Sequence, residues 1–275
     1  MTIVIPMAGS GQRFIDAGYK DPKPAIVVDG KMIVEYIIDI FPEKEKYVFI
    51  CNEDQKKHPT LIPMLEKIRP HSQVLTIPTH KKGPVFTVLP AFDQIPDDEP
   101  VIVAYCDGAV SLSFDHFKEY VDEQEYDGCL LTHTGFHPHN LSKTKMAYVK
   151  TDHSGFDERV TEVKEKASYT ENPQYEHASS GVYYFRTGAI LKKYFQMALD
   201  ENVNYNGECY ITLVYNLLIR DGLKVGYYDT DYVLILGTPE EVQNYEAWLK
   251  IIRNPYIKNV AHLAGTYNYW NEFVN

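Results

Sequence analysis

The chain has 275 residues, enough to bury a sizeable core and close to the upper limit for one domain. Its 27 Lys and Arg are outnumbered by 38 Asp and Glu, which gives a formal net charge of −11. Nucleic-acid and anionic-membrane binders need a basic surface field, so this balance argues against both. No apolar run approaches the ~20 residues of a bilayer span, and the first residues lack the segments of a secretory signal. We therefore expect a soluble, cytoplasmic protein.

The first half of the chain alternates strand-like apolar runs with amphipathic helical stretches. In chain order, we expect a strand at 2–7, a helix at 32–41, strands at 46–52 and 73–78 with a helix at 60–69 between them, a helix at 84–95 and a strand at 100–107. This alternation is typical of βαβ units. It predicts an α/β fold with a mostly parallel central sheet flanked by helices.

The alternation changes after Asp107. A helix is expected at 114–124 and a strand at 128–136, followed by shorter strands within 146–152, 159–167 and 179–188, helices at 189–201 and 210–222, and strands at 224–231 and 232–238. This order favours a small antiparallel extension of the parallel core. We found no internal repeat or linker, so we expect one domain over 1–250 with two functional lobes, 1–110 and 111–250, and a C-terminal tail at 251–275.

The cysteines Cys51, Cys106, Cys129 and Cys209 are widely spread, with no C-x-x-C pair. This spacing favours reduced thiols. The histidines His133, His137 and His139 are close together, but without neighbouring cysteines or helical spacing they favour a solvated or ligand-lining loop over a zinc site.

A glycine-rich segment follows the first strand, and such segments offer backbone N–H groups to anions. A Walker A loop is excluded because Gln12 and Arg13 follow Gly11. A dinucleotide-binding fingerprint is excluded because Phe14 stands at the third glycine, and we expect residues 15–22 to continue as a loop and not as a helix.

The remaining interpretation rests on the run Ala-Gly-Ser-Gly-Gln-Arg at 8–13, followed by Lys23 and Pro24. It resembles the A-G-x-G-x-R…K-P signature of the sugar-phosphate nucleotidyltransferases, which have a GT-A-like fold. The resemblance extends to about residue 250. It implies that Arg13 and Lys23 are catalytic and meet the charge of a nucleoside triphosphate as pyrophosphate leaves. The nucleotide-binding residues that it implies in this loop are Ala8, Gly9, Ser10, Gly11 and Gln12. A glycine-rich surface turn with solvated basic residues is the alternative.

Two further segments resemble the nucleotide side of this family. The stretch at 81–91 resembles the loop and helix that hold the base, which implies nucleotide contacts at His80 and Gly83. Asp107 follows the strand at 100–107, where the family carries its metal-binding Asp, so the resemblance implies Mg²⁺ on Asp107 beside the nucleotide. The position fits independently, because open α/β sheets bind ligands beyond the carboxyl ends of their strands. A plain strand-ending turn residue is the alternative.

The second half resembles the acceptor side of the family. The run T-E-V-K-E-K-A at 161–167 resembles V-x-E-K-P with Ala167 in place of Pro, and S-S-G-V-Y-Y-F at 179–185 resembles N-x-G-x-Y-x-F with Ser179 in place of Asn. The acceptor-binding residues that this implies are Glu165, Lys166, Gly181 and Glu208, with Lys166 on the acceptor phosphate. For Glu208 the alternative is a carboxylate favoured at a helix start.

One departure from the family pattern concerns the expected metal-binding site. Many relatives carry an Asp two residues before the glycine of their G-T-P-E segment, and this chain has Ile235 there. Asp229 and Asp231 lie upstream and are weak candidates to replace it, an acidic strand end being the alternative. The departure weakens the assignment of a sugar 1-phosphate as acceptor.

The resemblance implies transfer of a nucleoside monophosphate from an NTP, with CTP or UTP favoured, to a phosphorylated acceptor, foremost a sugar phosphate, with release of pyrophosphate. The pathway it implies is surface-glycan precursor synthesis, including capsule polysaccharide. One alternative is a cytidylyltransferase for a non-sugar acceptor that is phosphocholine-like, a polyol or derived from an amino acid. Others are a GT-A glycosyltransferase, against which Tyr105 argues by breaking a D-x-D motif, and an inactive nucleotide-binding protein. The aromatic tail at 262–275 is a candidate sheet-edge cover or homo-oligomer contact.

Overall fold

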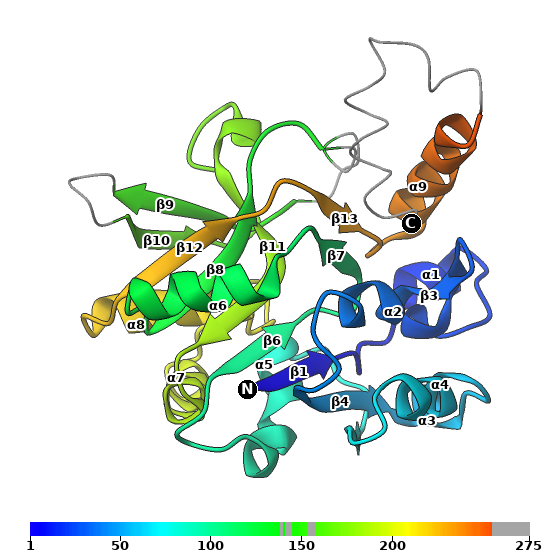
Figure 1. Ribbon diagram of the computed structural model, residues 1–275, viewed down its shortest axis with the longest axis horizontal. Helices are drawn as coiled ribbons and strands as arrows, with labels where there is room; N and C mark the ends of the chain where they lie inside the picture. The colour runs from blue at the N-terminus through cyan, green and yellow to red at the C-terminus, as the bar shows by residue number, and fades with distance from the viewer. Residues whose placement is uncertain (138–139, 141–144, 153–157, 255–275) are drawn as a thin grey trace.

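The computed structural model describes residues 1–137, 140, 145–152 and 158–254. Its central feature is a nine-stranded sheet (Figure 1). Four strands form a parallel core in the order β6-β1-β4-β5. Their bounds are Thr2–Pro6 for β1, Lys46–Asn52 for β4, Gln73–Ile77 for β5 and Val101–Ala104 for β6. Of the C-terminal tail expected at 251–275, residues 255–275 lie outside the described residues, as does His139.

The antiparallel part of the sheet begins at β11, which pairs with β6, β8 and β9. Beyond these, β10 is antiparallel to β9 and β12 is parallel to β8. The bounds are Gly128–His133 for β8, Tyr148–Asp152 for β9, Arg159–Lys164 for β10, His177–Phe185 for β11 and Val225–Asp229 for β12. The structure therefore confirms the predicted α/β class, with a parallel core and an antiparallel extension.

Alternation along β1 divides the core into two layers, because successive strand residues point to opposite faces. Val4 packs in the layer covered by α5 (Pro84–Val88), α7 (Gly188–Asp200) and α8 (Ile211–Arg220). Ile3 and Ile5 pack in the layer covered by α2 (Ile33–Ile38), α4 (Leu61–Ile68) and α6 (Phe114–Glu123). The buried strands are apolar on both sides for this reason.

A third apolar cluster joins the two ends of the described chain. Helix α9 (Pro239–Ile252) packs through Tyr245 against Phe14 and Tyr36, beside the short β7 (Gly108–Val110) and β13 (Val233–Ile235) pair. The remaining short elements are α1 (Gln12–Asp16), α3 (Glu53–Lys57), β2 (Val27–Val28), β3 (Lys31–Met32) and the 3-10 turns Lys23–Ala25, Leu89–Gln94 and Pro173–Tyr175. Figure 1 shows α9 beside β13, on the side of the molecule that also carries α1.

The structure corrects three expectations. Residues 12–16 form a short helix where a loop was predicted, because Gly11 adopts a left-handed conformation with φ 63° that turns the chain into it. The helix expected at 84–95 changes to a 3-10 turn after Val88, since Pro90 has no N–H to continue the α-helical ladder. His133 and His137, expected on a solvated or ligand-lining loop, are 2% and 3% exposed. All four cysteines are buried free thiols.

Among the described residues, no helix combines the length and the apolar character required to cross a membrane.

Candidate active site

A cavity of about 1080 Å³ opens at the carboxyl ends of β1 and β6. Its walls come from parts of the chain that are distant in sequence. They are residues 6–14, Lys23, residues within 80–87, residues 105–107, Lys145, Lys166, Glu208 with Tyr210, and residues 237–240. Parallel strands end at the same edge of a sheet, which is why their loops meet there.

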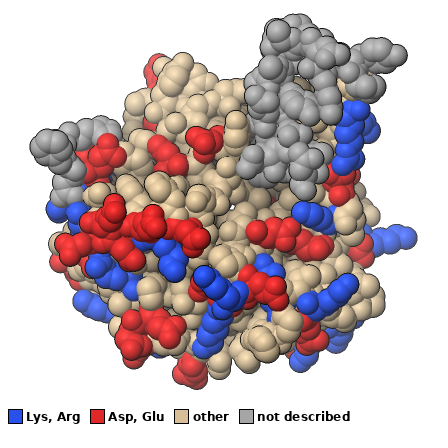
Figure 2. Space-filling model, viewed as in Figure 1, with Lys and Arg blue, Asp and Glu red and all other residues tan. Residues whose placement is uncertain are grey.

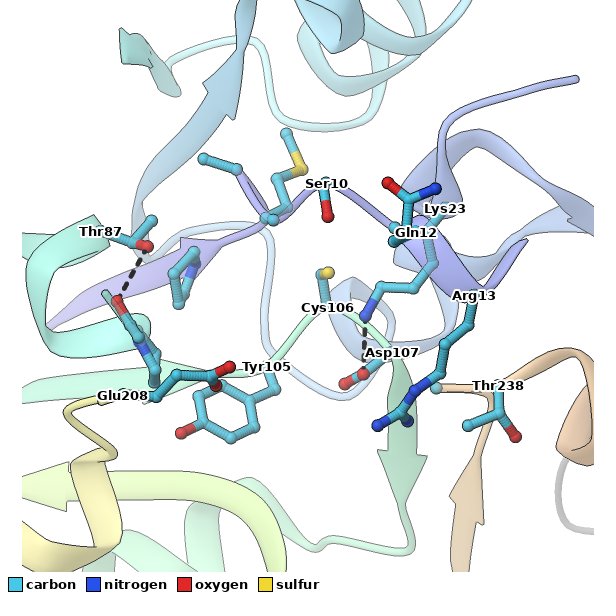
Figure 3. Close-up of a pocket in the computed structure, with 18 of the residues that line it drawn as sticks. Ser10, Gln12, Arg13, Lys23, Thr87, Tyr105, Cys106, Asp107, Glu208 and Thr238 are labelled. Atoms are coloured by element: carbon cyan, nitrogen blue, oxygen red, sulfur yellow. Dashed lines mark hydrogen bonds and ion pairs between the residues drawn. The ribbon is translucent and has the colours of Figure 1, made fainter. Parts of the chain in front are cut away.

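An ion pair lies in one part of the cavity. The Nζ of Lys23 is 2.8 Å from Oδ2 of Asp107, and the two side chains are 22% and 30% exposed. Burial disfavours the charged ammonium, but the carboxylate of Asp107 outweighs it and raises the pKa of Lys23. Figure 3 shows Arg13, Lys23 and Asp107 grouped together, with Tyr105 and Glu208 in another part of the pocket. The cavity therefore keeps a charged lysine beside its carboxylate.

Two glycines allow the chain to approach these charges closely. A Cβ on Gly11 would lie 3.4 Å from Cβ of Lys23. A Cβ on Gly237 would lie 3.0 Å from Oδ2 of Asp107 and 3.5 Å from Oε2 of Glu241. The first turn of α9 thus brings a second carboxylate, 3% exposed, near Asp107. Glu241 was not predicted from the sequence, and its only signal is its place three residues after Thr238 at a helix start.

A second set of charges faces the cavity from the antiparallel side. The Nζ of Lys166 donates to the hydroxyl of Tyr210, which in turn donates to Oε2 of Glu208 at 2.6 Å. Lys166 has a φ of 55°, an uncommon conformation for a residue with a side chain. Its ammonium also lies 4.4 Å from the centroid of the Tyr210 ring. Tyr210 was not predicted, and it links two residues that were.

Glu165 lies next to this set without lining the cavity. It is 8% exposed, and its Oε2 accepts a hydrogen bond of 2.5 Å from the hydroxyl of Thr212. Burial raises the pKa of Glu165. Gly181 also lies behind the cavity wall, where a Cβ would be 3.5 Å from the Tyr105 ring. Both residues support the wall in the structure.

The loop at 80–83 is joined to the segment around Cys209. The N–H of Cys209 donates to the carbonyl of Lys82 at 2.9 Å, and a Cβ on Gly83 would lie 2.5 Å from the backbone of Cys209. Nε2 of His80 is 3.3 Å from the hydroxyl of Thr87. Burial and the charge of Lys82 lower the pKa of His80, which favours the neutral imidazole. The two halves of the chain therefore meet at Gly83.

The structure brings most of the predicted site residues to one cavity. Its walls include Ala8, Gly9, Ser10, Gly11, Gln12, Arg13, Lys23, His80, Gly83, Asp107, Lys166 and Glu208. It does not bring Asp229 or Asp231 there. Asp229 accepts from Thr132 at 2.6 Å and lies 2.9 Å from Nδ1 of His177, while Asp231 is exposed on the connection between β12 and β13.

The basic side chains in the cavity stand out against an acidic surface. Figure 2 shows acidic side chains gathered over α6, which carries Asp115, Glu119, Asp122 and Glu123. The cavity walls contain five basic side chains, Arg13, Lys23, Lys81, Lys145 and Lys166, against three acidic ones, Asp107, Glu208 and Glu240. A cluster of positively charged side chains suits an anionic ligand, because nearby positive charges focus the local potential.

Three solved structures show the same fold at low sequence identity. A nucleoside-diphosphate-sugar pyrophosphorylase from Vibrio cholerae has a TM-score of 0.72 and 22% identity, over 89% of this chain and 99% of that one. A putative glucose-1-phosphate thymidylyltransferase from Bacillus anthracis has a TM-score of 0.65 and 14% identity, over 90% and 93%. An inositol-1-phosphate CTP transferase from T. maritima has a TM-score of 0.63 and 17% identity, over 87% and 90%.

No curated protein matches the chain. The family model described as "Nucleotidyl transferase" matches residues 3–248, which is nearly the whole chain and includes every wall of the cavity. The chain therefore belongs to the nucleotidyl transferase family and is a nucleotidyltransferase.

Proposed function

We propose that this chain transfers a nucleoside monophosphate from an NTP, CTP or UTP by preference, to a phosphorylated acceptor and releases pyrophosphate. The observation that carries the proposal is the joint position of the glycine loop (residues 7–13), the Lys23–Asp107 ion pair and Lys166 around one cavity. A phosphate oxygen of the acceptor attacks the α-phosphorus in line with the departing pyrophosphate. The acceptor brings its own charged nucleophile, so positioning and electrostatics are sufficient and no general base is needed.

Each basic side chain has a role in this reaction. Lys23 and Arg13 stabilise the negative charge that accumulates as pyrophosphate leaves, Arg through a forked contact and Lys as a point charge. Lys166 holds the acceptor phosphate across the cavity. Tyr210 supports this role because its hydroxyl orients the Lys166 ammonium and is itself held by Glu208.

The donor set beside Gly237 suits a hard divalent cation such as Mg²⁺. Among the described residues, no group of three His, Cys, Asp or Glu side chains is placed to hold a metal ion alone. Mg²⁺ commonly takes one or two carboxylates together with substrate phosphates, and Asp107 with the nearby Glu241 offers such a set. When bound, the ion supplies positive charge that neutralises the phosphates.

A sugar phosphate is the first proposed acceptor, and a non-sugar phosphorylated alcohol is the second. Two observations favour the second. The hydroxyl of Ser179, at the position where Asn was expected to recognise hydroxyls, lies 3.0 Å from the Tyr183 hydroxyl and is buried. The Glu208 carboxylate already accepts from Tyr210. Both leave fewer groups for sugar hydroxyls.

We place the reaction in the cytoplasm, as a source of precursors for a surface glycan such as a capsule polysaccharide. Residues 1–110 serve as the nucleotide-binding half in this proposal, and residues 111–250 serve as the acceptor-binding half.

The test is pyrophosphate release in the presence of Mg²⁺, with CTP, UTP, dTTP, ATP and GTP each combined with a panel of acceptors. The panel contains sugar 1-phosphates, phosphocholine, polyol phosphates and phosphorylated amino-acid derivatives. We expect release with one pyrimidine nucleotide and one acceptor class, reduced at least 100-fold by Lys23→Met. The matched control is Lys20→Met, an exposed lysine of the same segment. Equal rates in the Lys23→Met variant and the wild type would refute the assigned role.

A further inference from the structure

Two amide side chains behind the glycine loop form a clamp on its backbone. Asn52 is the last residue of β4, and Gln55 lies in the first turn of α3. They are 4% and 1% exposed. Buried amide groups require hydrogen-bond partners, so their orientation follows from the groups around them.

The amide oxygens of the pair are occupied by each other's backbone. Oδ1 of Asn52 accepts from the N–H of Gln55 at 2.9 Å, and Oε1 of Gln55 accepts from the N–H of Asn52 at 2.8 Å. This reciprocal cap starts α3. It also turns both NH₂ groups toward the glycine loop, because each oxygen is already committed to a donor.

The two NH₂ groups donate hydrogen bonds to three successive backbone carbonyls of the loop. Nδ2 of Asn52 donates to the carbonyls of Ala8 and Gly9, each at 3.3 Å. Nε2 of Gln55 donates to the carbonyl of Met7 at 2.5 Å and to that of Gly9 at 3.5 Å. The two side-chain amides thus donate four hydrogen bonds to one short stretch of backbone.

This arrangement determines where the loop's own N–H groups point. The described peptide bonds are trans, and in a trans peptide the C=O and the following N–H point in opposite directions. If the carbonyls of Met7, Ala8 and Gly9 face α3, the N–H groups of Ala8, Gly9 and Ser10 face the other side. These three residues line the cavity, and none of the hydrogen bonds found among the described residues uses their N–H groups.

We propose that Asn52 and Gln55 are positioning residues that direct the N–H groups of Ala8, Gly9 and Ser10 at a triphosphate. The inference rests on the proposed function for the identity of the anion. Successive N–H groups that point to one side form an anion-binding concavity. The residues that bind the nucleotide and the residues that shape the loop are thus different, and the latter sit about 45 residues further along the chain.

The decisive variant is Gln55→Glu, compared with the exposed Gln73→Glu as a charge-matched control. Glutamate keeps one oxygen for the N–H of Asn52 but, when ionised, repels the carbonyl of Met7. We expect the Kd for CTP or UTP, and for tripolyphosphate as a probe without a base, to rise at least tenfold at pH 8. The KM for the acceptor should change less than twofold.

A pH series separates this role from a merely structural one. Once protonated, the carboxyl group at position 55 donates an O–H to the Met7 carbonyl, so binding by Gln55→Glu should recover as the pH falls from 8 to 6. Burial favours the protonated form in this range. Wild type and Gln73→Glu should show no such recovery. Wild-type affinity of Gln55→Glu at every pH, or weak binding that acidification does not restore, would overturn the proposal.

Two further measurements cover the cases in which the variant does not fold or the wild type shows no turnover. If Gln55→Glu does not fold, hydrogen exchange of the wild type decides: added nucleotide should protect the amides of Ala8, Gly9 and Ser10, and unchanged exchange there would refute the clamp. If the wild type binds tripolyphosphate but no acceptor supports turnover, the proposed function fails while the clamp stands.

Discussion

At the scale of single residues, the site depends on side chains that hold other side chains. Lys166 and Glu208 are both anchored by the Tyr210 hydroxyl, and Lys23 is anchored by Asp107. An anchored charge loses less conformational entropy when its ligand arrives, which is the advantage of a preorganised site.

Tyr210→Phe tests this anchoring. The substitution keeps the ring beneath the Lys166 ammonium but removes the hydroxyl that Lys166 and Glu208 share. We expect the KM for the acceptor to rise roughly tenfold, which corresponds to about 1.4 kcal/mol, with the KM for the NTP unchanged. Steady-state kinetics with each substrate varied in turn would measure this. Tyr175→Phe, at a tyrosine that is 74% exposed, is the control. An unchanged acceptor KM would contradict the role given to Tyr210.

Glu165 gives a prediction on stability. Burial raises its pKa in the folded chain, so the folded state binds more protons than the unfolded state between the two pKa values. The contribution of Glu165 to stability is therefore fully present below the unfolded pKa and is lost as the pH rises through the folded pKa. Above its pKa in the folded chain, Glu165 is ionised and destabilises the fold.

Glu165→Gln removes this charge and keeps an oxygen for the Thr212 hydroxyl. We expect the Tm to rise by roughly 2–4 °C at pH 7.5, a shift that corresponds to about 1 kcal/mol in large domains. At pH 4 the gain should vanish because the wild-type carboxyl is then protonated. Thermal melts at the two pH values would measure the difference, and a gain of equal size at both would rule out the titration of Glu165 as its cause.

At the scale of elements, the cavity depends on places where two backbones touch. Gly83 is the clearest, because the loop at 80–83 lies against the backbone of Cys209. Its φ of 93° adds a second requirement, since that conformation disfavours any side chain.

Gly83→Ala should therefore lower both stability and activity. We expect a loss of about 2–4 kcal/mol in the free energy of unfolding, because the added methyl meets backbone atoms that have no free space. Gly18→Ala is the matched control: its φ is 87°, but a Cβ there meets nothing within 4 Å, so it carries only the conformational cost. Denaturant unfolding of both variants would separate the clash from the backbone strain. Equal losses would show that the contact with Cys209 is harmless.

The elements were more predictable from the sequence than the contacts between them. Apolar runs and helical spacing are local signals, so the strands at 46–52 and 73–78 and the helix at 114–124 were predicted nearly to their bounds. The motif at 8–13 is local too, and it located one wall of the cavity. Glu241, by contrast, lies near Asp107 because α9 belongs to the same apolar cluster as Phe14 and Tyr36.

The same reasoning explains the other residues that were missed. Asn52 and Gln55 look like an ordinary helix cap in the sequence, and their second set of hydrogen bonds exists only because β4 pairs with β1. Tyr210 was one of 22 tyrosines with no local feature to distinguish it. Contacts across the sheet carry no signature in a single sequence, whereas periodicity and turn chemistry do.

At the scale of the whole molecule, an acidic body surrounds a cavity with more basic than acidic side chains. Asp107 is an acidic side chain within that cavity, and its charge has two opposite effects on nucleotide binding. Its carboxylate neutralises Lys23 in the ligand-free chain and opposes a triphosphate, yet it is the proposed ligand for Mg²⁺. The same side chain should therefore help or hinder nucleotide binding according to whether the metal ion is present.

Asp107→Asn tests these two effects, because it should change nucleotide affinity in opposite directions with and without the metal ion. With EDTA, the variant should bind CTP or UTP roughly three- to tenfold more tightly than the wild type, because a negative charge is removed and Lys23 is released toward the phosphates. With Mg²⁺, it should bind more weakly, since the proposed metal ligand is lost. Isothermal titration under both conditions measures the two effects.

Asp115→Asn on α6 changes the net charge by the same single unit but lies on the acidic surface away from the cavity. It should shift both affinities by less than twofold, because exposed charges beyond about 10 Å are largely screened at ordinary ionic strength. If Asp115→Asn reproduced the tighter binding in EDTA, the effect would belong to the overall charge of −11 and not to the ion pair. If Asp107→Asn weakened binding by the same factor under both conditions, the carboxylate would act by holding Lys23 in place, and a metal-dependent role for Asp107 would be excluded.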